Sequence, residues 1–167
     1  YGLATRAVLT ALDVALVDHE LNCCGYPVRD QDQTASILAA ARNLALAARA
    51  GLALMTPCQC CYGQLKHADY WLRQREALRR HVNGQLAEEG LRWEAGTGIY
   101  HLLQVLETSI GLEAIRARIR QPLTGLGIAA HYGCHALRPG HVTGFDNPLA
   151  PTLFEKLVSV TGAKAVN

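Results

Sequence analysis

The sequence predicts an α/β fold in which helices flank a small, mainly parallel sheet of roughly three to five strands. Short apolar runs at 14–18, 52–56 and 126–130 have the length and composition of buried strands. Segments with apolar residues at three- and four-residue spacing lie between these runs, and this spacing is typical of amphipathic helices. Because the two patterns alternate along the chain, successive strands are expected to run in the same direction.

Composition narrows the class of protein further. With 167 residues, of which 50% are hydrophobic, the chain can bury a sizeable core and should form one domain or slightly more. A net charge of +2 is too small to argue for a nucleic-acid partner. No apolar run approaches the roughly 18 residues that would span a bilayer. We therefore expect no transmembrane segment and a soluble, cytoplasmic protein that is at most peripheral to a membrane complex.

The first third of the chain contains the clearest pattern. Residues 3–12 are predicted to form a helix that leads into the strand at 14–18. Residues 35–50 have apolar side chains on one stripe, and Gly51 stands at the position where helices commonly stop. The strand at 52–56 follows directly. This order, helix, strand, helix, strand, sets up the predicted parallel sheet.

The remaining two thirds continue the alternation. Residues 91–100 are expected to form a short strand or a loop, 126–130 a third buried strand, and 163–166 the start of a fourth. The predicted helices of this part occupy 58–72, 75–89, 101–106, 112–119 and 151–161.

Cysteines carry the functional signal. Five of the six fall in two groups: Cys23 and Cys24, and then Cys58, Cys60 and Cys61, while Cys134 stands alone. The doublet follows the predicted strand at 14–18, so we place it on a loop at the carboxyl end of that strand. Ligand sites in open α/β sheets are built at this edge. Two thiol groups on two loops at one edge predict a binding or catalytic site.

The second cysteine group is predicted to open a helix. Thr56 has the character of an N-cap and Pro57 of a first helical residue, which places Cys58 in the first turn. Cys61 is three residues further on and shares the face of Cys58, whereas Cys60 points elsewhere. The positive end of a helix dipole favours thiolates, which are better metal ligands and better nucleophiles than thiols.

Several interpretations of the thiols remain open. A single cysteine is often a small buried hydrophobe, and this applies to Cys60 and Cys134. Packing explains an adjacent pair poorly, and a disulfide framework does not suit a chain of this size that lacks a signal peptide. Thiolates favour an iron–sulfur cluster or zinc, and a CxxC that opens a helix also resembles thioredoxin-type dithiol motifs.

The two cysteine motifs resemble those of a known family. Cys-Cys-Gly at 23–25 followed by CxxC at 58–61 is similar to the cysteine-rich (CCG) domain family, which includes the B subunit of heterodisulfide reductases. Related copies occur in succinate, glycolate and lactate oxidoreductase subunits. The resemblance extends to flanking segments at 56–58, 65–68, 101–103, 131–134, 138–139 and 145–148.

The resemblance implies a ligand set and a domain organisation. In the family the domain occurs twice, and each copy uses an upstream cysteine, a doublet and a CxxC pair. Residues 1–121 then correspond to the first repeat without its N-terminal strand and upstream cysteine, and 122–167 to the start of the second. The implied ligands of a non-cubane [4Fe–4S] cluster are Cys23, Cys24, Cys58 and Cys61, with Cys134 as the upstream cysteine of the second repeat.

The implied function is that of an oxidoreductase subunit resembling the heterodisulfide reductase B subunit. It would reduce a disulfide or another small molecule with electrons from iron–sulfur and flavin subunits. We expect the chain to be a fragment, truncated at both ends, that is inactive and has no complete ligand set. Zinc is the alternative metal, in a scaffold domain that docks such subunits, and a metal-free dithiol protein is a further alternative.

This interpretation makes a geometric prediction. Sulfurs of Cys23 or Cys24 should converge with those of Cys58 and Cys61 in one pocket even without metal, and in air these thiols can oxidise to a disulfide. Cys134 should stand apart from them. The prediction depends on the segments at 14–18, 52–56 and 126–130 sharing one sheet.

Overall fold

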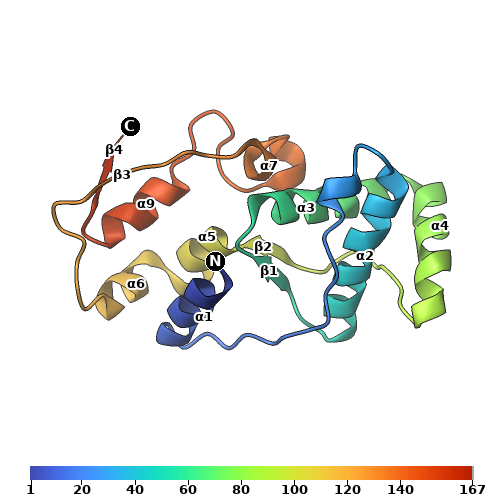
Figure 1. Cartoon of the computed structure of the whole chain (residues 1–167), viewed down its shortest axis with the longest axis horizontal. Helices are drawn as coiled ribbons and strands as arrows, with labels where there is room; N and C mark the ends of the chain where they lie inside the picture. Colours follow the sequence, from blue (N-terminus) through green and yellow to red (C-terminus); the bar gives the residue numbers. More distant parts are fainter. Residues whose placement is uncertain (167) are drawn as a thin grey trace.

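The structure is a computed structural model that describes residues 1–166, and it has an α/β fold with parallel strands (Figure 1). Strand β1 (Leu54–Thr56) pairs with β2 (Ile99–His101), and β3 (Gly127–Ala129) pairs with β4 (Lys164–Val166). The fold class is confirmed. The prediction of one sheet with three or more strands is wrong for residues 1–166, where the four strands form two separate pairs.

Helices surround both strand pairs. The longer ones are α1 (Gly2–Ala11), α2 (Gln33–Arg49), α3 (Gln59–Gln74), α4 (Glu76–Leu86), α6 (Leu112–Arg118) and α9 (Leu153–Val160). The shorter ones are α5 (Leu102–Gln104), α7 (Cys134–Leu137) and α8 (Gly140–Thr143), with 3-10 turns η1 (Tyr26–Val28) and η2 (Ala87–Glu89) and a π-helical segment η3 (Val105–Ile110). Every predicted helix is present. Most differ from the predicted ranges by one to three residues at an end, and some predicted helices correspond to two consecutive helical elements.

The predicted strand at 14–18 is wrong. These residues have neither helical nor strand structure, and the side chain of Val17 is 61% exposed. The chain beyond them is held instead by a side-chain amide of α2. The backbone N–H of Asn22 donates to Oδ1 of Asn43 at 3.0 Å, and Nδ2 of Asn43 donates to the Asn22 carbonyl at 3.0 Å. A buried amide therefore satisfies the backbone that a neighbouring strand would have satisfied.

Helix α2 begins at a side-chain cap and buries an alanine- and leucine-rich face. Oδ1 of Asp32 accepts from the backbone N–H of Ala35 at 2.9 Å, which satisfies one of the unpaired donors of the first turn. Ala40, Ala41 and Leu44 have no exposed surface. Small side chains on this face let α3 and α4 approach closely.

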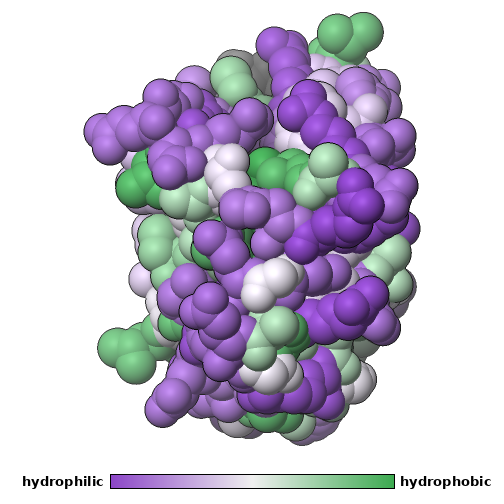
Figure 2. All heavy atoms as spheres, turned by 90° about the vertical axis from the view of Figure 1, so that its right-hand side faces the viewer, coloured by the Kyte–Doolittle hydropathy of each residue, from purple (hydrophilic) through white to green (hydrophobic). Residues whose placement is uncertain are grey.

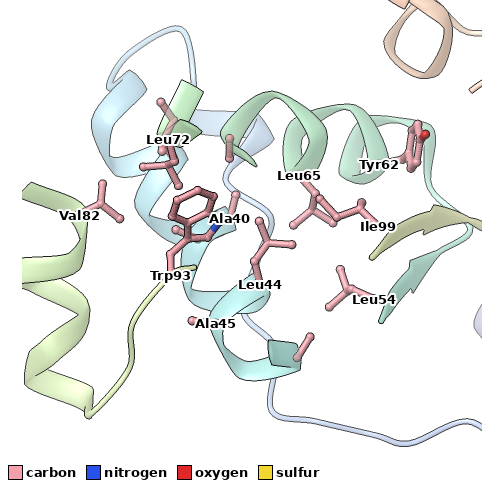
Figure 3. Packing of buried hydrophobic residues seen from close by; sticks show 14 of the residues in the cluster. Ala40, Leu44, Ala45, Leu54, Tyr62, Leu65, Leu72, Val82, Trp93 and Ile99 are labelled. Atoms are coloured by element: carbon pink, nitrogen blue, oxygen red, sulfur yellow. The ribbon is translucent and has the colours of Figure 1, made fainter. Parts of the chain in front are cut away.

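The largest buried cluster lies between α2, α3, α4 and the β1–β2 pair (Figure 3). Leu44, Leu65 and Leu72 pack with Val82 and Trp93, which come from α4 and the segment that follows it. This cluster fixes α3 relative to α2. Because α3 begins within the second cysteine group and α2 follows the first, the core sets the distance between the two groups.

The side of the molecule that carries α4 faces solvent. Hydrophilic side chains cover most of this face (Figure 2), and Arg80 and Glu76 on α4 are 75% and 68% exposed. No helix formed by residues 1–166 is both long and apolar enough to cross a membrane.

Candidate cysteine site

Gly25 fixes the cysteine doublet against α2. Its φ of +85° lies in the left-handed region, and a Cβ atom at this position would lie 2.4 Å from the Ser36 carbonyl oxygen. The hydroxyl of the buried Ser36 donates to the Gly25 carbonyl at 2.8 Å. Only glycine combines this backbone conformation with so close an approach. The third residue of Cys-Cys-Gly therefore positions the two before it.

The second cysteine group lies where β1 passes into α3. Oγ1 of Thr56 accepts from the backbone N–H of Cys58 at 3.1 Å. Cys58 is the N-cap of α3 and the helix begins at Gln59, so the prediction of Thr56 as N-cap and Cys58 in the first turn is wrong. The backbone of Cys58 is extended, with φ −100° and ψ 121°, so it cannot belong to the first helical turn. Cys61 lies in the first turn of α3.

The structure brings the two groups together at Cys24 and Cys61. Cys24 is 7% exposed, and interaction with the neighbouring Cys61 thiol lowers the pKa of Cys24 to about 6. Interaction with Cys24 and burial raise the pKa of Cys61, because a second negative charge beside the first is unfavourable. The pair therefore favours ionisation of Cys24 alone over ionisation of both thiols.

The other thiols of the two groups surround this pair. Cys23 and Cys58 are exposed, and they lie beside Cys24 and Cys61 respectively. Cys60 is half-buried, and burial and the proximity of Cys58 raise the pKa of Cys60. It lies at the edge of the thiol cluster and not in the hydrophobic core. All the cysteines are free thiols.

Cys134 begins α7 and is exposed. Helix α7 packs on α3 at Gly63, where a Cβ atom would lie 2.4 Å from the His135 carbonyl oxygen. The segment that leads into α7 also meets the start of α3, because a Cβ atom at Gly133 would overlap the side-chain amide of Gln59. The expected separation of Cys134 from the other thiols stays a prediction.

Tyr26 borders the thiol cluster and was not predicted as a site residue. Its hydroxyl lies 2.5 Å from Nε2 of His135, and the two rings meet edge to face with centroids 4.8 Å apart. The backbone of Tyr26 helps to lower the pKa of Cys24, and its side chain lies near Cys60. Its place two residues after the doublet was the available signal, but contact with His135 joins residues more than a hundred positions apart.

A largely apolar cavity of about 600 Å³ lies beside Cys58. The carboxyl ends of β1, β2 and β3 meet there, and they contribute Pro57, His101 and Ala130. His101 is 3% exposed and caps α5, where its Nδ1 accepts from the Leu103 N–H at 3.2 Å. The cavity provides space for a small molecule next to a thiol.

The donor set suits a thiophilic metal centre. Cysteine sulfur is the preferred ligand of iron–sulfur clusters and is common at zinc sites. Among residues 1–166, however, His, Cys, Asp and Glu side chains do not converge in a group of three or more that could hold a metal ion. A metal held by these thiols would require rotation of side chains, and Cys23 and Cys58 are exposed.

Comparisons with known proteins find one matching family model and several similar sequences. Residues 1–66 match the family described as "Cysteine-rich domain" (CCG). The chain is 32% identical over 167 residues to the B subunit of the ferredoxin/F(420)H(2)-dependent CoB-CoM heterodisulfide reductase of Methanosarcina acetivorans, a match that covers 98% of this chain and 55% of that protein. It is 33% identical over 163 residues to the "8-methylmenaquinol:fumarate reductase membrane anchor subunit" of Wolinella succinogenes, covering 96% and 56%.

A solved structure shares the fold. The crystal structure of a hypothetical protein from Helicobacter pylori superimposes with a TM-score of 0.71 at 18% identity, over 98% of this chain and 29% of that one. The chain spans about half the length of the curated relatives it matches. Residues 1–66 thus match the cysteine-rich (CCG) domain family, and the chain as a whole is similar in sequence to about half of each of these relatives.

Proposed function

We propose that the chain is part of an oxidoreductase subunit that resembles the heterodisulfide reductase B subunit. Cys23, Cys24, Cys58 and Cys61 would hold a non-cubane [4Fe–4S] cluster, and Cys134 would serve the second repeat that begins at 122. The observation that carries the proposal is the proximity of Cys24 to Cys61, through which each thiol shifts the pKa of the other and the doublet adjoins the CxxC pair.

The chain's own residues prepare this site. A bound cluster supplies one-electron transfer. The Ser36 hydroxyl holds the Gly25 carbonyl, and Thr56 holds the Cys58 N–H, so both cysteine segments are oriented by neutral hydrogen bonds. The Cys24 thiolate, favoured by its neighbour Cys61, is in the ionisation state that a metal ligand needs.

The proposed reaction is disulfide reduction. Two electrons and two protons convert R–S–S–R′ into R–SH and R′–SH, and the electrons come one at a time from a partner iron–sulfur or flavin subunit. The cavity beside Cys58 is large enough to receive the sulfur-bearing end of a small substrate. The relatives' names support a multi-subunit reductase, because one relative belongs to a heterodisulfide reductase and another is a fumarate reductase membrane anchor subunit.

Anaerobic reconstitution with iron and sulfide tests the proposal, on this chain and on the longest polypeptide that contains it. We expect bound iron and sulfide and a paramagnetic signal by EPR in one redox state. Cys24→Ser and Cys61→Ser should lose most of the iron, whereas Cys60→Ser should retain it because Cys60 matches no ligand position.

The competing functions give different results in the same experiment. A diamagnetic product that binds only zinc would favour a docking scaffold. A protein that binds neither metal and cycles between a Cys24–Cys61 disulfide and two thiols would favour a dithiol redox protein. Either result would contradict the iron–sulfur assignment.

A further inference from the structure

A second, smaller cavity of about 160 Å³ is lined in part by Tyr26, whose backbone also interacts with the thiol of Cys24. It is enclosed by η1, the first turns of α2, the middle of α3 and the start of α7. None of the cysteines lines it. Its polar lining includes Tyr26, Arg29, Asp30, Gln64, His67 and His135.

Arg29 provides a permanent positive charge at this cavity. Its guanidinium lies over the Tyr26 ring, 4.2 Å from the centroid, which restrains a side chain that is 37% exposed. Its ion-pair partner Asp30 is adjacent in sequence, at 3.3 Å, and is 87% exposed. An ion pair as exposed as this one is weak. Asp30 therefore neutralises little of the positive charge of Arg29 at the cavity.

His67 adds a second basic group from α3. Burial lowers the pKa of His67, and the nearby Arg29, His135 and His141 lower it further. Arg29 and His135 line the same cavity as His67, and Asp30 is the only carboxylate lining the cavity among the described residues. The start of α2, a helix of 17 residues, adds the positive end of its dipole. The cavity therefore combines one fixed cation, Arg29, with imidazole groups that can donate hydrogen bonds.

We infer that this cavity binds a small oxyanion, such as a phosphate or a carboxylate group, held by Arg29 and His67. The volume accommodates one such group and not a larger ligand. The guanidinium of Arg29, which follows η1, and the imidazole of His67 on α3 are donors that match the acceptor oxygens of such an anion. The inference stands independently of the proposed cluster, because it uses no cysteine.

The anion can come from two sources, which share this chemistry. One is a free anion that stabilises the packing of η1, α2, α3 and α7. The other is the acid group of a small disulfide whose sulfur end lies at the thiol cluster, since Tyr26 borders both places.

Calorimetric titration with inorganic phosphate, at constant ionic strength and with chloride as reference, tests the site. Arg29→Gln should weaken phosphate binding at least tenfold, and His67→Gln should also weaken it. Arg80→Gln is the matched control, because this substitution removes the same charge at a 75% exposed position on α4. Proton NMR of the His67 ring should show phosphate raising its pKa, since an anion favours the imidazolium.

A second titration distinguishes the sources. A short dialkyl disulfide with terminal carboxylates is compared with its terminal-alcohol analogue. Tighter binding of the acid that disappears in Arg29→Gln identifies a substrate tail, whereas equal binding of acid and alcohol, together with Arg29-dependent phosphate binding, identifies a free anion. If phosphate binds wild type, Arg29→Gln and Arg80→Gln equally, or does not bind at all, the inference is overturned.

Discussion

Two glycines show how closely side-chain size controls the candidate site. Gly25 approaches the Ser36 carbonyl of α2, and Gly63 of α3 approaches the His135 carbonyl of α7, so that a Cβ atom at either position would lie 2.4 Å from backbone oxygen. Gly25 also has a positive φ, whereas Gly63 lies within a regular helix. The first glycine therefore sets the path of the doublet, and the second sets the distance between α3 and α7.

Replacing Gly25 by alanine should destabilise the protein by roughly 2–4 kcal/mol, because the added methyl group meets backbone oxygen and the left-handed conformation disfavours a side chain. Gly84→Ala in α4 is the control. A Cβ atom there meets nothing within 4 Å, and the change should be neutral or stabilising by about 0.5–1 kcal/mol. Urea unfolding measures both, and equal stabilities would contradict the packing of Gly25 on α2.

His101 should make stability depend on acid pH. Burial lowers the pKa of His101 from 6.5 to about 4, so the unfolded chain takes up a proton below pH 6.5 that the folded chain excludes. The free energy of unfolding is therefore unaffected by this group above pH 6.5 and decreases as pH falls towards 4. The decrease amounts to about 3 kcal/mol. His101→Asn retains a capping acceptor without a titrating group. It should therefore flatten the pH profile of the free energy of unfolding.

The matched control for this measurement is His81→Asn on α4, where the side chain is exposed. Its profile should follow that of the wild type between pH 7 and pH 4. If His101→Asn shows the same acid loss as His81→Asn, the folded protein does not keep His101 neutral.

Helices were easier to predict than strands, and the reason is physical. The stripe at 35–50 predicted α2 to within two residues, because periodicity and a capping residue are local properties. The apolar run at 14–18 looked equally like a strand, yet a strand needs a partner. Strand β1 pairs with β2, where Leu54 lies opposite Ile99. The sequence of neither segment indicates a pairing between residues so far apart in the chain.

The N-cap of α2 supports the loop that carries the doublet. Asp32→Ala removes the acceptor for the Ala35 N–H and should cost about 1 kcal/mol of stability. Asp30→Ala is the comparison, since Asp30 is 87% exposed and is paired only with its neighbour Arg29. It should change stability by less than about 0.5 kcal/mol. Thermal unfolding followed by circular dichroism compares the two, and equal losses would contradict the capping role.

Across the whole molecule, the thiol groups meet for a different reason from the one predicted. The sequence indicated that two strand ends would deliver them to one sheet edge, but the doublet follows an irregular segment. Packing of α2 on α3 brings the groups together instead, through Gly25 against the first of these helices and Cys61 in the first turn of the second. The two groups of thiols could be identified from the sequence. The helix packing that brings them together could not, because it depends on the folded core.

Oxidative trapping of Cys24 and Cys61 tests this meeting of the two groups most directly. In a variant with Cys23, Cys58, Cys60 and Cys134 changed to serine, mild oxidation of the native protein with diamide should form an intramolecular disulfide, detected by non-reducing mass spectrometry. A second variant that retains only Cys24 and Cys134 should remain reduced under the same conditions. Failure of the first variant to form the disulfide, or equal oxidation of both, would contradict a shared site for the doublet and the CxxC pair.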